Sequence, residues 1–412
     1  MTATDGPVAQ GPRPIGIGLV SVGWMGRLHS QSYQRVNYHY PDLPLRPRLV
    51  IAADTEPSRA ADAVDRLGYA EATDDWRKVV AHPDVEALSI TAPNHLHRDI
   101  AVAAAASGKH FWVEKPVGRA PAETLEIARA AEAAGVLTAA GFNYRLAPAV
   151  QRARELVRSG RIGRVTHARG VFLNDYAAEP RSPLTWRFRR SLAGSGALGD
   201  LMSHAVDLLQ YIVGPVAEVS ALSATVIPER PAAPAGAANH FAPPADGMLA
   251  PVENEDYVGA LLRFRGGAVG TCEASRVTVG PRCQVGFEVY GTDGSVSWDF
   301  ERMNELRACV GRSGPDHGYA TVLAAPGHGD YGQFQPGPGI GMGYDDLKVA
   351  EAARFLRSIA CGRQYGAGVA AARATALVLG AIDRASVSAR WERVDEPGQE
   401  PPAASLGQQA RQ

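Results

Sequence analysis

The 412-residue chain has few cysteines, no excess of charge of either sign and no long apolar run, and each absence excludes a class of protein. Its four cysteines include no Cys-x-x-Cys pair, so we expect no zinc site, redox dithiol or disulfide scaffold, and a reducing cytoplasm is the expected location. The 42 basic residues balance 43 acidic ones, which argues against a nucleic-acid partner. No segment approaches the ~20 apolar residues of a membrane span, and we expect no secretory signal peptide at residues 1–14.

What the chain does have, early in its length, is a repeated alternation of short apolar runs with helical patterns. Strands are predicted at 15–22, 48–54, 85–91 and 110–114, and a helical pattern follows each of them. Such β-α-β alternation with short connections indicates an α/β fold, a doubly wound parallel sheet with helices on both faces. We therefore predict a Rossmann domain at 14–146.

Beyond residue 146 the strand candidates follow one another without intervening helices. They occur at 165–173, 257–264, 268–275, 283–290 and 295–300, with glycine-containing turns between several of them. This predicts an α+β domain at 147–394 with an open, mostly antiparallel sheet, one face of which is covered by helices at 200–212, 345–360 and 369–387. Residues 1–13 and 395–412 are expected to be a disordered leader and tail, and two irregular loops of open role are expected at 227–251 and 325–343.

A glycine-rich turn, Ser21-Val-Gly23-Trp24-Met25-Gly26, follows the first predicted strand. Dinucleotide sites place G-x-G-x-x-G there because glycines allow a tight turn, close approach of the pyrophosphate and close packing of helix on strand. The helix N-terminus then offers N–H groups to the phosphates. Ser21 replaces the first glycine, so a plain strand–helix turn is the alternative.

Asp54 ends the second predicted strand. An acid at that place binds the adenosine ribose hydroxyls and repels a 2′-phosphate, which favours NAD over NADP. A helix N-cap is its other interpretation.

Two polar segments follow later strands, at the sheet edge where such folds bind ligands. Thr91-Ala-Pro-Asn94-His-Leu-His97 could line a cofactor, or it could be a loop with a helix cap. In Glu114-Lys115-Pro116 the proline holds Lys115 extended, which fixes the direction of its side chain. A lysine held in a cleft can donate a proton, whereas a solvated lysine would be the ordinary alternative.

A third candidate segment is helical and follows a run of glycines. Asp200 and His204 are four residues apart and share a helix face with Asp207. A histidine oriented by a carboxylate is a usual acid/base arrangement, and a helix cap with a core histidine is the alternative. Two ligands without a third do not make a metal site, so no metal is predicted.

Together these residues resemble the Gfo/Idh/MocA family, named for glucose–fructose oxidoreductase and inositol dehydrogenase. The resemblance extends from Ile15 to Cys361 and is densest at 88–146, where Gly141-Phe-Asn143-Tyr144-Arg145 adds to the segments above. It implies an N-terminal Rossmann domain and a C-terminal α/β domain whose open sheet forms the interface of a homodimer or homotetramer. It also implies that Lys115 is the catalytic lysine, His204 the acid/base and Asp200 its partner at the substrate.

The predicted contacts divide into two sets. The resemblance places Asn94, His97 and Glu114 near the nicotinamide half, and it directs Trp186-Arg187 toward cofactor and substrate. The predicted cofactor contacts are Gly23, Trp24, Met25, Gly26, Asp54, Thr91, Asn94, His97, Glu114, Lys115, Asn143, Trp186 and Arg187. The predicted substrate contacts are Lys115, Arg145, Asn174, Asp200, His204 and Tyr344, and the polar aromatics Tyr144, Tyr176 and Trp186 also suit a sugar.

We therefore expect an NAD-dependent dehydrogenase that oxidises a secondary hydroxyl of a sugar, anhydrosugar, glycoside or cyclitol to a ketone. His204 would take the hydroxyl proton as hydride leaves for NAD, and Lys115 would steady the alkoxide. One alternative keeps and recycles its NAD, as an epimerase, a lyase or a glycoside-cleaving enzyme acting through a transient keto-sugar. The other is a non-catalytic NAD or sugar sensor, which would not need the three proton-handling residues. The sequence leaves the sugar and the oxidised carbon open.

Overall fold

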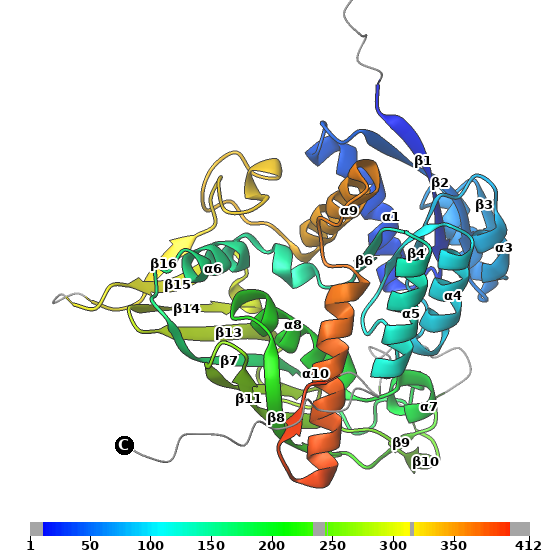
Figure 1. Ribbon diagram of the computed structural model, residues 1–412. Coiled ribbons are helices and arrows are strands. Elements are labelled where there is room, and N and C mark those ends of the chain that lie inside the picture. The colour runs from blue at the N-terminus through cyan, green and yellow to red at the C-terminus, as the bar shows by residue number, and fades with distance from the viewer. Residues whose placement is uncertain (1–10, 234–243, 245, 314–316, 396–412) are drawn as a thin grey trace, which may run out of the picture.

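The computed structural model describes residues 11–233, 244, 246–313 and 317–395, and it contains two sheets (Figure 1). Within those residues the first sheet has six parallel strands in the order β3-β2-β1-β4-β5-β6. They are β1 (Arg13–Val20), β2 (Leu45–Ala53), β3 (Glu71–Thr73), β4 (Ala87–Ile90), β5 (His110–Val113) and β6 (Thr138–Ala140). The strand order reverses between β1 and β4, and such a switch point is where doubly wound sheets bind ligands.

Helices cover both faces of this sheet. One face packs against α1 (Trp24–His39), α2 (Pro57–Asp65) and α9 (Tyr344–Cys361). The other packs against α3 (Trp76–Ala81), α4 (Asn94–Ala106) and α5 (Pro121–Ala133). The predicted doubly wound fold is therefore confirmed.

Helix α9 lies on a different sheet from the one expected for 345–360. Phe355 and Leu356 of α9 are fully buried in one cluster with Ile15 and Ile17 of β1. The apolar stripe of a helix shows which side is buried, but it does not identify the sheet against which that side packs. The chain thus returns from the second domain to complete the first.

The second sheet has nine strands among the described residues, in the order β16-β15-β14-β13-β7-β12-β11-β8-β17. It is antiparallel except for one parallel pair, β7 with β12. Its strands are β7 (Val165–Asn174), β8 (Val216–Ala224), β11 (Tyr257–Phe264), β12 (Val269–Ser275), β13 (Cys283–Gly291), β14 (Gly294–Asp299), β15 (Glu305–Val310), β16 (Ala320–Leu323) and β17 (Glu392–Arg393). The predicted open, mostly antiparallel sheet is confirmed.

One face of the second sheet is covered and the other is open. The covering helices are α6 (Pro148–Arg158), α8 (Ser203–Ile212) and α10 (Val369–Ser388), and they share one apolar cluster with the sheet. Short elements complete the fold: α7 (Arg190–Ala193), the ribbon of β9 (Glu229–Pro231) with β10 (Leu249–Pro251), and single turns at Asn143–Leu146, Trp186–Phe188, Leu198–Met202, Phe300–Arg302 and Tyr331–Gln333.

The segments expected to be irregular are described only in part. The loop at 325–343 is held by Tyr331, a fully buried residue whose hydroxyl lies 2.9 Å from Gly337 O and 2.7 Å from Ile340 O. Most of the expected leader and tail, and the middle of the 227–251 loop, lie outside the described residues. Within the part of the chain that the structure describes, no helix is both long and apolar enough to cross a bilayer.

Candidate active site

The turn between β1 and α1 has the geometry that its glycine pattern predicts, although Ser21 stands at the first position. Ser21 has a φ of 76°, in the left-handed region that glycine adopts most easily. Its carbonyl oxygen accepts a hydrogen bond from Thr91 Oγ1 at 2.7 Å. A Cβ on Gly26 would lie 2.1 Å from that same oxygen, so only glycine fits there. Ser21 therefore makes the turn at a conformational cost.

The N-terminus of α1 is available to an anion. The described residues give α1 no side-chain cap at Gly23, and its first turn contains no acidic residue. A Cβ on Gly23 would meet only Ser21 Oγ, at 3.9 Å, so the backbone there is open. Uncapped N–H groups at a helix N-terminus bind phosphate. Gly23, Trp24 and Met25 thus fit the pyrophosphate of a dinucleotide.

Asp54 lies directly beside this turn. Its carboxylate accepts hydrogen bonds from the Val22 N–H at 2.7 Å and the Glu56 N–H at 2.9 Å. An ionised carboxylate can accept about four hydrogen bonds, so capacity remains for ribose hydroxyls. Asp54 therefore braces the turn beside the open N-terminus of α1.

Hydrogen bonds from Asn94 and His97 to backbone oxygens fix the segment after β4. The buried ring of His97 lies between two backbone oxygens, with Nδ1 2.9 Å from Pro116 O and Nε2 2.7 Å from Ala92 O. Asn94 Nδ2 donates to Ala193 O at 3.0 Å. The two carbonyls occupy the nitrogens of His97, so His97 supports the backbone around Lys115, and its predicted contact with a cofactor stays a prediction.

Lys115 and Asp200 meet at the carboxyl ends of the strands. Lys115 Nζ donates to Asp200 Oδ1 at 2.9 Å and to Asp200 O at 2.7 Å. Tyr176 donates its hydroxyl hydrogen to Asp200 Oδ2 at 2.9 Å. Lys115 comes from the first domain and Asp200 from the second, so the pair lies where the two domains meet.

His204 is buried one turn after Asp200. Aromatic rings surround it, with the ring of Tyr144 at 4.7 Å, Phe172 at 5.8 Å and Phe142 at 5.9 Å between centroids. Burial first, and the Lys115 ammonium second, lower the pKa of His204 well below its usual value. Its ring is therefore neutral at pH 7 and can accept a proton.

Asp200 stands on a wide helical turn. Residues Leu198–Met202 form a π-helix that continues directly into α8. Such turns carry one extra residue and are frequent at functional sites. The wide turn sets the direction of Asp200 relative to His204, and no pattern of residue types predicts it.

Glu114 points into a buried charge cluster, which consists of His29, Glu114, Lys348 and Glu351. Glu114 Oε1 lies 2.5 Å from Lys348 Nζ and 3.0 Å from His29 Nε2. Lys348 also contacts Glu351 Oε2 at 2.8 Å. Burial acts to raise the pKa of Glu114, but Lys348 and His29 outweigh it, so the carboxyl stays ionised.

Arg145 and Asp207 form a second buried ion pair. Arg145 donates through Nε to Asp207 Oδ2 at 2.6 Å and through a terminal nitrogen to Oδ1 at 2.5 Å. This two-bond contact ties the segment after β6 to α8, and it engages the guanidinium predicted to bind substrate. Asn143, next to it, is fully buried and interacts with the hydroxyl of Tyr344.

The remaining predicted residues contact Tyr176, Trp24 or one another. Asn174 ends β7 and accepts the Tyr176 N–H at 2.8 Å. The guanidinium of Arg187 lies 4.4 Å from the ring of Trp186, and Arg187 acts on the ionisation of Tyr176. Tyr344, at the start of α9, stacks on Trp24 at 5.8 Å and so links the glycine turn to the second domain.

Sequence reasoning missed the members of the charge cluster other than Glu114. Lys348 and Glu351 could have been noticed as charges on the apolar stripe of a predicted helix, since buried charges are rare unless paired. His29 gave no comparable signal.

A parallel sheet with an open helix N-terminus at its switch point, beside an ordered lysine and a neutral histidine, defines a dinucleotide-binding oxidoreductase. The chain belongs to the GFO/IDH/MocA oxidoreductase family. Residues 15–142 match the family's NAD-binding Rossmann fold, and residues 150–297 match its C-terminal domain. The chain is thus an NAD-binding oxidoreductase.

Relatives of known name match over nearly the whole chain. The chain is 38% identical to the levoglucosan dehydrogenase of Pseudarthrobacter phenanthrenivorans over 93% of this chain and 98% of the relative. A structure of levoglucosan dehydrogenase with NADH and levoglucosan has a TM-score of 0.87 at 36% identity, covering 93% of this chain and 100% of that one. A crystal structure of an NAD binding oxidoreductase from Klebsiella pneumoniae has a TM-score of 0.85 at 36% identity with the same coverage.

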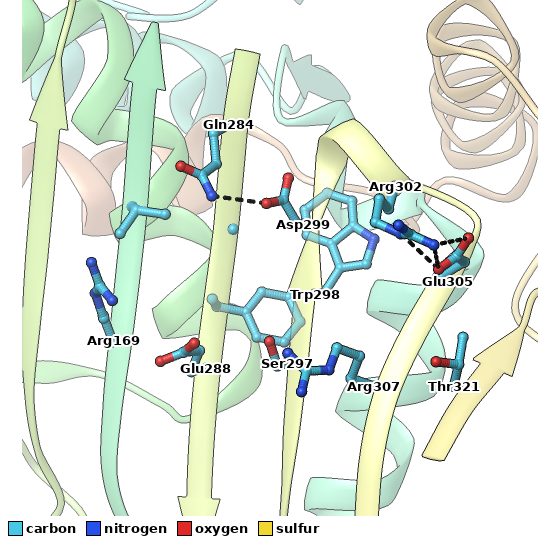
Figure 2. Close-up of a pocket in the computed structure, with 13 residues that line it drawn as sticks. Arg169, Gln284, Glu288, Ser297, Trp298, Asp299, Arg302, Glu305, Arg307 and Thr321 are labelled. Carbon is cyan, nitrogen blue, oxygen red and sulfur yellow. Dashed lines mark hydrogen bonds and ion pairs between the residues drawn. The ribbon is translucent and has the colours of Figure 1, made fainter. Parts of the chain in front are cut away.

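A separate hollow of about 430 Å³ lies on the open face of the second sheet (Figure 2). Two pairs of polar residues in its lining bind each other, as Gln284 donates to Asp299 at 2.9 Å and Arg302 to Glu305 at 2.9 Å. The hollow lies away from Lys115, Asp200 and His204, none of which lines it. It therefore has no part in the chemistry of those residues.

Proposed function

We propose that this protein is an NAD-dependent dehydrogenase that oxidises a secondary ring hydroxyl of a sugar or anhydrosugar to a ketone. The observation that carries the proposal is the contact of Lys115 with Asp200 beside the neutral ring of His204. The similarity to levoglucosan dehydrogenase supports an anhydrosugar as the first substrate to test.

Each residue has a separate task in the proposed reaction. Gly23, Trp24 and Met25 would hold the pyrophosphate of NAD, and Asp54 would hold the ribose. The bound cofactor supplies the hydride acceptor. His204 takes the proton from the substrate hydroxyl, and the C–H electron pair leaves as hydride, so that alcohol and oxidised cofactor become ketone, reduced cofactor and one proton.

Lys115 stabilises the oxygen as it gains negative charge. Its ammonium is held by Asp200 and needs no reorganisation when that charge develops. Tyr176 fixes the other carboxylate oxygen of Asp200 and keeps the pair in place. A preorganised donor of this kind is worth about 10²–10³ in rate.

The test is NADH formation by the purified protein with NAD or NADP and a panel of anhydrosugars, aldoses, glycosides and inositols. We expect absorbance from NADH with levoglucosan or a related anhydrosugar, and a preference for NAD because of Asp54. Conversion of a sugar without net NADH, by protein that retains NAD through purification, would overturn the proposal in favour of an enzyme that recycles its cofactor.

We also propose that the open face of the nine-stranded sheet joins two copies of the chain. Leu261 and Val269 expose 51% and 52% of their surface on β11 and β12. Light scattering should show a dimer or tetramer, and Leu261→Glu should shift it toward monomer. A monomeric wild type at micromolar concentration would contradict this.

A further inference from the structure

Lys348, from late in the sequence, binds the side chain of Glu114, the residue before Lys115. Lys348 of α9 is 234 residues away from Glu114, yet its Nζ lies 2.5 Å from Glu114 Oε1. Its side chain is fully buried. The nearby ring of Trp112, at 5.3 Å, provides an additional favourable contact for the ammonium.

Glu114 is confined next to Lys115. Its Oε2 lies 3.3 Å from the backbone nitrogen of Lys115. On its other side the carboxylate packs against Gly141, where a Cβ would lie only 2.3 Å from that oxygen, so only glycine leaves space for Glu114 there. Without a cation of its own, Glu114 would compete with Asp200 for the Lys115 ammonium, because an unpaired buried carboxylate attracts the nearest positive charge strongly.

We propose that Lys348 is a positioning residue for the reaction, which pairs with Glu114 so that Lys115 stays on Asp200. The inference rests on the proposed roles of Lys115 and His204. Lys348 touches neither of them through a hydrogen bond in the described structure, and it acts through Glu114.

The charges that act on His204 support this role. Among the described residues they are Lys115, Glu114, Lys348 and Asp200, and the phenol ring of Tyr144 packs against the imidazole. Lys348 lowers the pKa of His204 and Glu114 raises it. Removing Lys348 therefore raises the pKa of His204, because the cation that offsets Glu114 is lost.

Glu351 also contacts Lys348, so the effect of removing Lys348 on Glu351 must be separated from its effect on Glu114. Burial raises the pKa of Glu351 to about 7, and the variant Lys348→Met would leave two buried carboxylates without a cation. Glu351→Gln keeps the contact of Lys348 with Glu114 and serves as the reference protein. Adding Lys348→Met to that reference leaves Glu114 as the single unbalanced charge of the cluster. Lys109→Met removes a lysine that binds His82 O and Val85 O elsewhere, and it controls for general destabilisation.

The experiment measures kcat and KM against pH with the substrate found in the panel, and the dissociation constant of NAD by fluorescence. Relative to Glu351→Gln, we expect Lys348→Met to lower kcat by at least about tenfold and NAD affinity by less than about threefold. The acid limb of kcat/KM should move to higher pH. Adding Glu114→Gln should return that limb to its original pH.

Two results would overturn the inference. One is a folded Lys348→Met/Glu351→Gln protein with the kcat and pH profile of its reference. The other is an acid limb that stays displaced after Glu114→Gln is added, because Lys348 would then not act through Glu114. Failure of the proposed function is distinguishable, since it would appear as full turnover by Lys115→Met, irrespective of Lys348.

Discussion

Lys115 and Asp200 come from positions 85 residues apart, and their contact joins the two domains at the reacting centre. The Lys115 ammonium pairs with Asp200, and the carboxylate of the preceding residue, Glu114, pairs with Lys348. At the scale of single residues, the geometry of the site depends on two ion pairs, Lys115 with Asp200 and Lys348 with Glu114.

Removing the Lys115 ammonium should abolish turnover while sparing cofactor binding. We expect Lys115→Met to lower kcat by about 10²–10⁴, because the developing alkoxide loses its donor. Steady-state assays and NAD titration measure the two effects. Lys109→Met, away from the site, should retain full activity, and retention of activity by Lys115→Met would refute the assignment.

The pH profile should report His204. Burial and Lys115 lower the pKa of His204 below its usual 6.5, so the folded protein keeps it neutral into acid. We expect kcat/KM to be constant above pH 6.5 and to fall only at lower pH, as the ring gains a proton and loses its ability to accept one. His204→Asn should give low activity without that acid limb. An acid limb of unchanged position and slope in His204→Asn would assign the titration to another group.

Ser21 offers a test of backbone strain. With a φ of 76°, a residue with a Cβ costs about 1 kcal/mol more than glycine. Ser21→Gly should therefore raise the free energy of unfolding by about 0.5–1 kcal/mol. Thermal melting checks this, with Ser107→Gly as control because Ser107 has a φ of -89° and gains nothing from glycine. Equal melting temperatures for Ser21→Gly and wild type would contradict it.

At the scale of elements, the sequence predicts strands and the turns after them better than it predicts what helices pack against. The runs that became β1, β4 and β5 are short and apolar, and their carboxyl ends carry Gly23, Asn94 and Lys115, so neighbouring strands were enough to bring these residues together. The place of α9 depends on tertiary packing, and local periodicity holds no information about it. The charge cluster could not be predicted for the same reason, since Lys348 and Glu351 arrive with α9.

Helix α1 places the ring of His29 between Ser89 of β4 and Glu114, which follows β5. These two partners determine which ring nitrogen of His29 carries the hydrogen. The Glu114 carboxylate only accepts, so His29 Nε2 carries the hydrogen, and Nδ1 accepts from the Ser89 hydroxyl at 3.1 Å. Burial lowers the pKa of His29 from 6.5 to about 4. A depressed folded-state pKa gives stability that is present above pH 6.5 and is lost as pH falls toward 4.

His29→Gln should therefore cost more stability at pH 7 than at pH 4.5. The difference between the two conditions should be about 1–3 kcal/mol, because the wild type loses the His29 contribution in acid and the variant has none to lose. Denaturant unfolding at both pH values measures it. An equal cost at the two pH values would show that His29 does not ionise across this range.

At the scale of the whole molecule, a helix from late in the sequence completes the core of the first domain. Phe355 and Leu356, from a helix that follows all but the last strand of the second sheet in the sequence, are fully buried in one cluster with residues of β1. A fragment of residues 11–146 should consequently show no cooperative thermal transition, because the sheet face that carries α1 and α2 loses the apolar cover of α9. Circular dichroism tests this, and appending residues 344–361 through a flexible linker should restore a transition. A cooperative melt of the fragment alone would contradict it.

The π-helix at Leu198–Met202 has a consequence for inheritance. A wide turn contains one residue more than an α-helical turn, so loss of a single codon there would rotate Asp200 by about 100° with respect to His204. Both sheets and the nucleotide turn would be untouched by such a deletion. A lineage could thus lose or regain the anchor of Lys115 in one genetic event while keeping its architecture, and gene copies that differ by this codon would diverge in chemistry before they diverge in shape.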